Sequence, residues 1–162
     1  MTTGLIAPPH TAIRIAAVPT PFLQRVRKGH DDQGQAVKRL IAEGGEPCRD
    51  VLRRARPGEE LILASFTPFT RSGPYKEYGP VFVLAEESNE HADPTTLPLH
   101  GYLRDRFVIR AYSREETILD AAMCSPIDAA ETIDRFFESP GTAFLHVRFP
   151  TYGCFAMRID RA

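Results

Sequence analysis

Two residues in this sequence, a cysteine and a histidine, could carry nucleophilic chemistry. Residues 47–55 are predicted to form a short helix with Pro47 at its first position, where the missing N–H costs nothing. Cys48 would then lie at the positive end of the helix and beside Arg49, and both charges stabilise a thiolate. His146, in an apolar strand near the C-terminus, would act as the acid or base. If the two side chains meet, the sequence predicts a thiol-dependent enzyme.

Both residues also have a structural interpretation. A buried cysteine often packs as a small apolar side chain, and Cys48 could simply dock its helix onto the sheet. A buried histidine is usually a core residue whose ring nitrogens have hydrogen-bond partners, which would describe His146. The spacing assigns no base to Cys48, and Cys124 and Cys154 are interpreted as buried core thiols. The sequence therefore leaves the roles of Cys48 and His146 open.

Arginine and tyrosine side chains form a second group with a chemical meaning. Arg106 and Arg110 are expected on one face of a strand, with Tyr112 beyond them, and Arg148 lies on a later hairpin. A guanidinium binds a carboxylate or phosphate with two parallel hydrogen bonds, and burying it without a partner is costly. The sequence thus predicts a pocket for a small, anionic ligand, and these are its candidate residues: Arg49, Tyr75, Arg110, Tyr112 and Arg148, with His146 nearby.

Motifs for metals, phosphates and cofactors are absent from the sequence. It contains no C-x-x-C, no H-E-x-x-H and no G-x-G-x-x-G pattern. The acidic run between Glu86 and Asp93 lacks the spacing of a calcium loop and is interpreted as a solvated loop. Ser65 has no flanking glycines, which excludes a nucleophile elbow. We therefore predict neither a metal site nor a cofactor.

Composition and charge restrict the class of protein. The 162 residues include 20 Lys and Arg against 21 Asp and Glu, so no global field favours nucleic acid or an anionic membrane surface. No run approaches the ~20 apolar residues that a membrane-spanning helix needs. Three widely spaced cysteines, without an apparent export signal, indicate free thiols in a reducing compartment. A cytoplasmic protein that binds neither nucleic acid nor membranes is expected.

The first two thirds of the chain alternate short apolar runs with turns rich in proline and glycine. Strands are predicted at residues 11–18, 35–42, 61–66 and 80–86. A short helical segment is predicted at residues 22–28, in addition to the helix at 47–55. Residues 67–79 and 87–104 are predicted to be long loops, which are either functional or mobile.

The last third has clearer patterns. Residues 106–112 and 117–123 are predicted to form an antiparallel hairpin, followed by a helix at 126–138 that Ser125 caps and that packs through an apolar stripe including Ile127. Residues 143–149 and 153–160 are predicted to form a closing hairpin that lies centrally in the sheet. If Phe149 pairs with Cys154, one face of this hairpin carries six side chains: Phe144, His146, Arg148, Phe155, Met157 and Ile159.

These elements predict a single α+β domain over residues 1–162, built mainly on antiparallel sheet. Several short motifs in the chain also resemble those of a known family. They are Pro47-Cys48-Arg49, Pro57-Gly58-Glu59, Tyr75, the segment 79–83, Arg110-Ala111-Tyr112, Leu145-His146-Val147, Gly153-Cys154 and the segment 158–161. In this order they resemble an uncharacterised bacterial family, domain of unknown function 1203, over about residues 45–162. The resemblance implies a bacterial cytosolic protein and supplies no activity, cofactor or partner.

Three functional hypotheses follow from the sequence. The first is a domain that binds a small, anionic molecule through the arginines and tyrosines. The second is a thiol-dependent enzyme that uses Cys48 with His146. The third is an interaction or structural module whose long loops meet a partner protein. A monomer or a homodimer is expected, since a sheet of this kind leaves an edge strand free to pair.

Overall fold

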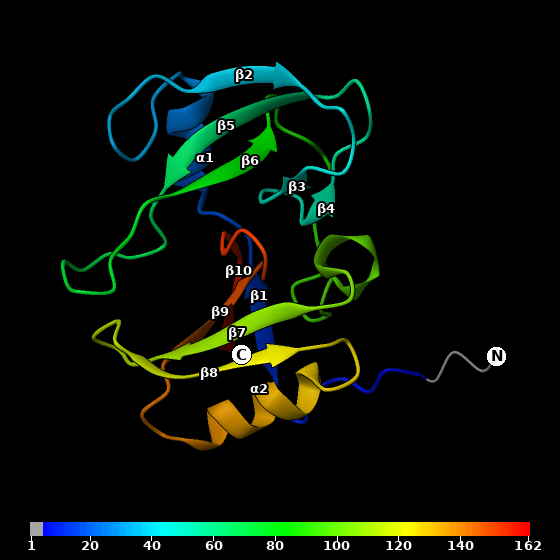
Figure 1. The fold of residues 1–162 in the computed structure, drawn as a ribbon, viewed down its shortest axis with the longest axis vertical. Coiled ribbons are helices and arrows are strands. Elements are labelled where there is room, and N and C mark those ends of the chain that lie inside the picture. Colours follow the sequence, from blue (N-terminus) through cyan, green and yellow to red (C-terminus); the bar gives the residue numbers. More distant parts are fainter. Residues whose placement is uncertain (1–4) are drawn as a thin grey trace.

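The computed structural model describes residues 5–162, which fold into two five-stranded sheets with one α-helix packed on each (Figure 1). The first sheet has the order β1-β10-β9-β7-β8 and the second has the order β2-β5-β6-β3-β4. The first sheet comprises β1 (Ile13–Ala16), β10 (Phe155–Arg161), β9 (Phe144–Arg148), β7 (Phe107–Tyr112) and β8 (Ile118–Cys124). The second comprises β2 (Lys38–Ile41), β5 (Glu60–Phe66), β6 (Gly79–Leu84), β3 (Pro47–Cys48) and β4 (Arg53–Arg54).

The first sheet joins the two ends of the chain. β1 pairs with β10, so that Ile15 lies opposite Ile159, and the predicted closing hairpin β9–β10 lies in the middle of the sheet. Helix α2 (Ala129–Glu138) covers one face through Ile133 and Phe137 (Figure 1). All five residues of β9 are buried, which confirms the central position predicted from its apolar faces.

Helix α2 begins later than the sequence predicts. Residues 126–128 form a turn in which the backbone N–H of Ser125 donates to Oδ1 of Asp128 at 2.6 Å, and the α-helix begins at Ala129. Because the helical turn starts after this point, Ile127 does not join the apolar stripe and is 85% exposed. The helix itself is confirmed, but its predicted cap at Ser125 is wrong.

The second sheet packs on α1 (Thr20–Arg27), whose Phe22 and Val26 are buried against β5 and β6. The weakly patterned segment 35–42 does form a strand, β2, which pairs antiparallel with β5. Phe155 from β10 also belongs to this core and lies 5.3 Å from Phe66, ring centre to ring centre. The cores of the two sheets are therefore in contact at the start of β10.

The helix predicted at residues 47–55 is absent, and the segment folds as two short strands. Cys48 in β3 pairs in parallel with Phe82 of β6 and antiparallel with Arg53 of β4, with a turn at residues 49–52. Leu52 has a φ of 52°, in the left-handed region that a helix does not contain. Sheet pairing and the burial of Cys48 and Leu52 outweigh the helical propensity of the segment.

The closing hairpin contains a bulge that changes which side chains share a face. Phe155 lies opposite Arg148 as predicted, but the register shifts between Phe155 and Met157, and Arg158 then lies opposite His146. Met157 therefore packs on the α2 side of the sheet rather than beside His146. A bulge inserts one residue into one strand and reverses the alternation beyond it, which the sequence pattern did not reveal.

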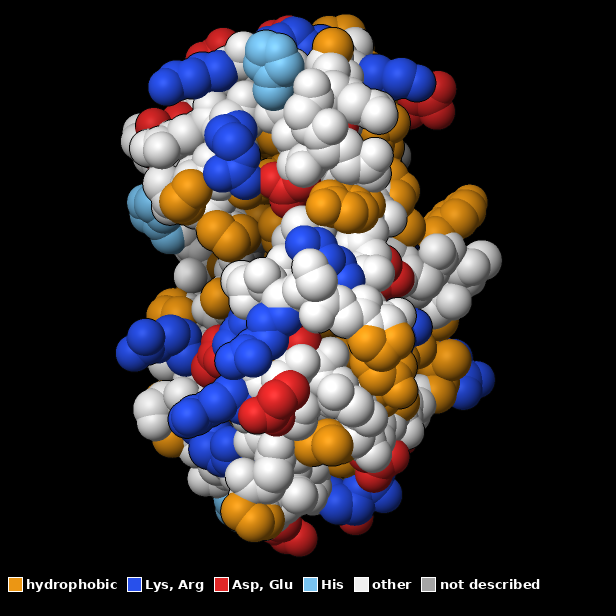
Figure 2. Space-filling model, turned by 90° about the vertical axis from the view of Figure 1, so that its left-hand side faces the viewer, with side chains coloured by type: hydrophobic (Ala, Val, Ile, Leu, Met, Phe, Trp, Pro, Cys, Tyr) orange, Lys and Arg blue, Asp and Glu red, His pale blue; other side chains and the backbone are white. Residues whose placement is uncertain are grey.

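The described residues form one α+β domain in which antiparallel pairing predominates, as predicted; residues 1–4 of the predicted domain lie outside them. An irregular helical turn, η1 (Leu99–Leu103), interrupts the predicted loop 87–104. Within residues 5–162 no helix is long and apolar enough to span a membrane. Figure 2 shows basic side chains with acidic ones among them on the lower half of one face, over the first sheet.

Candidate functional site

A cavity of about 860 Å³ lies where the second sheet meets the turn of the closing hairpin. Its walls come from the segment before β3, from β5 and β6, from the segment after η1 and from the turn 149–154. Its charged lining residues are Glu43, Glu46, Arg49, Arg54, Arg104, Asp105 and Arg106. Its main apolar lining residues are Leu63, Pro80, Phe82, Leu103 and Phe149. The volume is that of a small-molecule site.

Arg49 is the most buried charge in this cavity, with 2% of its surface exposed. Its Nε donates to the carbonyl of Phe155 at 2.8 Å, and its Nη1 donates to the carbonyl of Pro47 at 2.8 Å. Within the described residues no carboxylate pairs with it and no hydrogen bond uses its Nη2. Burial lowers the pKa of Arg49 from its ordinary value, because a charged guanidinium is less stable away from water.

Two further arginines, Arg54 and Arg104, line the same cavity as Arg49 and add positive charge to it. Arg54 is held by the carbonyls of Gly45 and Tyr102 at 2.9 and 2.8 Å, and no ion pair in the described residues includes it. Burial lowers the pKa of Arg54, and the positive charges of Arg104 and Arg49 lower it further. These guanidinium groups are therefore close enough to repel one another, and an anion between them would relieve that repulsion.

The acidic side chains of the cavity do not neutralise these arginines. The carboxylate of Glu46 accepts the backbone N–H groups of Glu43 and Gly44, each at 2.9 Å, and these bonds lower its pKa although its partial burial opposes the shift. Phe149 lies under the guanidinium groups of Arg49 and Arg54, each 5.1 Å from its ring centre. Cation–π contact and backbone carbonyls thus hold the arginines in place and leave their charge uncompensated.

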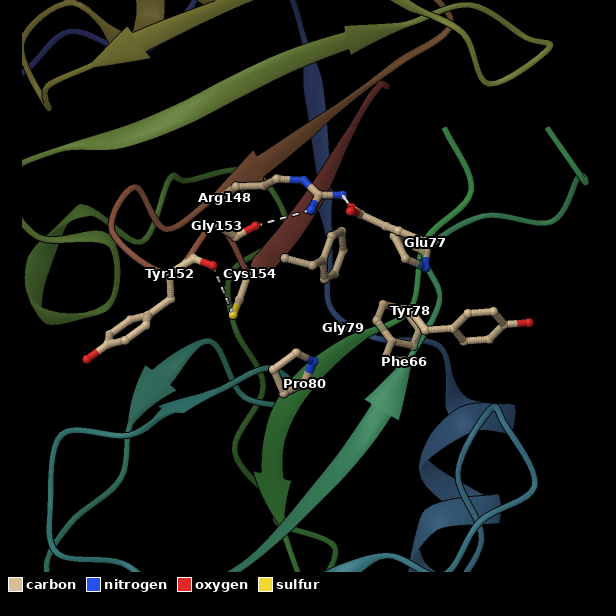
Figure 3. Close-up of a pocket in the computed structure, with 11 residues that line it drawn as sticks. Phe66, Glu77, Tyr78, Gly79, Pro80, Arg148, Tyr152, Gly153 and Cys154 are labelled. Carbon is tan, nitrogen blue, oxygen red and sulfur yellow. Dashed lines mark hydrogen bonds and ion pairs between the residues drawn. The ribbon is translucent and has the colours of Figure 1, made fainter. Parts of the chain in front are cut away.

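A smaller cavity of about 200 Å³ lies next to the first and shares Pro80, Tyr152 and Cys154 with it. Its charged lining residues are Arg148 and Glu77, which point toward each other and form an ion pair (Figure 3). Arg148 comes from the central strand β9, and Glu77 comes from the loop 67–79. The two cavities therefore adjoin at the turn of the closing hairpin.

The structure brings together only part of the predicted ligand set. Arg49 lines the larger cavity and Arg148 lines the smaller one. Tyr75 lies on the loop 67–79, 41% exposed, and lines neither cavity. Arg110 and Tyr112 lie on β7, on the face of the first sheet opposite α2, and also line neither. The predicted pocket requires these side chains to converge with Arg49 and Arg148, and Arg110 and Tyr112 do not line either cavity.

The structure argues against the predicted reactivity of Cys48. This thiol is fully buried in β3, not at a helix start, and burial raises its pKa to about 12, with Asp50 adding to the effect. Its Sγ donates only a long contact of 3.7 Å to the carbonyl of Glu46. Cys48 and His146 lie in different sheets and share no hydrogen bond in the described chain. The apolar core interpretation of Cys48 fits these observations.

His146 is completely buried among four aromatic rings, which belong to Phe69, Tyr112, Phe144 and Phe155. Neither ring nitrogen has a hydrogen-bond partner in the described residues. Burial lowers the pKa of His146 well below its ordinary value, and the charges of Arg148, Arg158 and Arg110 act in the same direction. A neutral imidazole packed in this way lines neither cavity, and no group of metal-ligating residues forms around it in residues 5–162.

Sequence reasoning missed three residues of the site. Cys154 is half-buried and lines both cavities, although it was interpreted as a core thiol. Arg54 and Arg104 line the larger cavity but stand next to no motif. The sequence signal for Cys154 is weak and consists of the glycine before it, since glycine is common in tight turns. In the structure Gly153 has a φ of 74°, which confirms such a turn.

The fold and the two cavities define a small α+β domain with basic, partly apolar pockets. A comparison with protein families matches residues 45–161 to the family described as "Protein of unknown function (DUF1203)". The chain therefore belongs to this family, which confirms the resemblance found in the sequence. No curated protein and no solved structure matches the chain.

Proposed function

We propose that the domain binds a small organic anion in the larger cavity, with the acidic group at Arg49 and the apolar part against Phe82 and Leu103. One observation carries the proposal: Arg49 is buried, and within the described residues it has no anionic partner. A buried cation is stable only with good hydrogen bonds or a counter-ion. Here backbone carbonyls supply the hydrogen bonds, but no carboxylate among residues 5–162 supplies the counter-ion.

The composition of the cavity indicates the kind of anion. A carboxylate or phosphate matches the planar guanidinium of Arg49, and the charges of Arg54 and Arg104 strengthen the attraction from a short distance. The apolar walls formed by Leu63, Phe82 and Leu103 offer contact for an uncharged hydrocarbon part. We expect an organic carboxylate to bind better than either an inorganic anion or a neutral molecule of the same shape.

Cys154 provides a test of this proposal, since its thiol lines the larger cavity. Iodoacetate and iodoacetamide alkylate thiols by the same reaction but differ in charge. We expect the ratio of iodoacetate to iodoacetamide rates at Cys154 to be about tenfold higher in the native protein than in the denatured protein, corresponding to about 1.4 kcal/mol of attraction. Peptide mass spectrometry measures the ratio, and Cys48 and Cys124, both buried, should react only after unfolding.

Variants separate a local site from general surface charge. Arg104→Gln and Arg106→Gln change exposed residues of the cavity rim and should lower the rate ratio at Cys154 several-fold. Arg114→Gln removes the same charge from an exposed turn outside the cavity and should leave the ratio unchanged. Equal ratios in native and denatured protein, or equal effects of all three variants, would refute an anion site in this cavity.

A further inference from the structure

The smaller cavity contains a second buried cation, Arg148, which is 4% exposed. Its Nη1 donates to the carbonyl of Gly153 at 3.2 Å, and its Nη2 forms the ion pair with Glu77. Its Nε is buried and has no hydrogen-bond partner within residues 5–162. The guanidinium therefore lines a cavity with part of its hydrogen-bonding capacity unused.

The partner of Arg148 is held much less firmly than Arg148 itself. Glu77 lies on the loop 67–79, and 44% of its side chain is exposed, against 5% for Arg148. No other hydrogen bond or ion pair in the described chain uses the carboxylate of Glu77. Because Glu77 is half in water, moving it out of the cavity restores its hydration and costs little. A carboxylate in this position can be exchanged for another one.

The two buried arginines are attached to the same end of the closing hairpin. Arg148 lies directly opposite Phe155 in the β9–β10 pair, and the carbonyl of Phe155 accepts the Nε of Arg49. Residues paired across antiparallel strands have Cα atoms about 5 Å apart, so the backbone of Arg148 lies beside the residue whose carbonyl holds Arg49. The two cavities also share Cys154, Tyr152 and Pro80 as lining residues.

We propose that the smaller cavity is a second anion subsite and that the ligand is a small dicarboxylate, with one acidic group at Arg49 and the other at Arg148. In the absence of ligand, the carboxylate of Glu77 occupies the second subsite, as Figure 3 shows. Binding exchanges Glu77 for the ligand's second carboxylate, which can use the free Nε as well as Nη2. This inference rests on the proposed function, because it assigns the first acidic group to the larger cavity.

The test compares glutarate with glutaramate, its monoamide, which has the same length and one charge less. Titration calorimetry on the full chain at low ionic strength should show glutarate binding at least tenfold more tightly. Glu77→Gln removes the competing charge and should raise glutarate affinity several-fold further, whereas Glu87→Gln, at an exposed position outside both cavities, should leave it unchanged. Arg148→Gln should reduce the difference between the two probes to less than twofold.

The results distinguish this inference from the proposed function. Benzoate, which carries one acidic group, is titrated in parallel with neutral benzamide. If benzoate binds in preference to benzamide while glutarate and glutaramate bind equally, or while Glu77→Gln has no effect, the second subsite is refuted and the first remains. If benzoate and benzamide behave alike, the proposed function fails as well. Because Glu77 is half-exposed, Glu77→Gln should fold normally even if Arg148→Gln does not.

Discussion

At the scale of single residues, two buried charges and one thiol define the candidate site. Arg49 and Arg148 are buried cations that each line one of two cavities, and Cys154 lines both cavities. Cys48, by contrast, lies in a strand inside the apolar core and not at a helix start, so its surroundings do not favour a reactive thiolate. The chemistry of the site therefore follows from arginines rather than from Cys48 and His146.

His146 gives a prediction about stability and pH. Its pKa in the folded protein is well below 6.5, so on acidification the unfolded chain binds a proton that the folded chain does not. The free energy of unfolding should therefore fall by about 1.4 kcal/mol between pH 7.5 and pH 5.5 because of this one residue. The charges facing it, Arg148, Arg158 and Arg110, act in the same direction as burial.

Denaturant unfolding of the variant His146→Leu tests this prediction. The variant should lose this part of the pH dependence, and its stability at pH 7.5 should be little changed, since no hydrogen bond in the described chain depends on the imidazole. His91→Gln removes an exposed histidine and serves as the control that keeps the wild-type slope. An identical slope in wild type and His146→Leu would show that folding does not lower the pKa of His146.

At the scale of elements, the contacts between η1 and the closing hairpin hold the larger cavity open. Tyr102 in η1 donates its hydroxyl to the carbonyl of Ala156 at 2.7 Å, and its ring meets Phe149 edge-on at 5.5 Å. Arg54 in β4 donates to the carbonyl of Tyr102. One irregular turn thus connects the second sheet to the first, and the cavity lies beside this connection.

The hydroxyl of Tyr102 can be removed without changing the packing of its ring. Tyr102→Phe leaves the buried carbonyl of Ala156 without this donor and should lower the free energy of unfolding by about 1–3 kcal/mol. Thermal and denaturant unfolding measure the loss. Tyr152→Phe, at a residue that is 88% exposed, should have no measurable effect. If both variants are equally stable, the bond between η1 and β10 contributes nothing to the fold.

At the scale of the whole molecule, the sequence predicted the elements better than their assembly. Period-two patterns and turn residues located most of the strands, since these signals are local. The helix predicted at residues 47–55 is wrong because this segment pairs with β6. The predicted face of Met157 is wrong because a bulge shifts the register of β10. Neither feature leaves a local pattern in the sequence. The first sheet includes β1 through its pairing with β10, which brings together segments from opposite ends of the chain.

The difference between local signals and long-range assembly also explains which residues of the candidate site could be predicted from the sequence. Residue type alone predicts Arg49 and Arg148 as ligand contacts, and both line cavities in the structure. The same argument predicts Tyr75 and Arg110, which line neither cavity, because a single sequence does not tell which side chains converge. The larger cavity is bounded by segments from four parts of the chain, and such convergence is a property of the whole fold.

The central claim is that the larger cavity binds an organic anion at Arg49, and side-chain NMR tests it most directly. The guanidinium carbon signals of the arginines are followed at low ionic strength while benzoate or benzamide is added. We predict that the signals of Arg49 and Arg54 shift saturably with benzoate and not with benzamide, while the exposed Arg114 gives no saturable shift. Unchanged signals for Arg49, or equal shifts with both compounds, would contradict the claim.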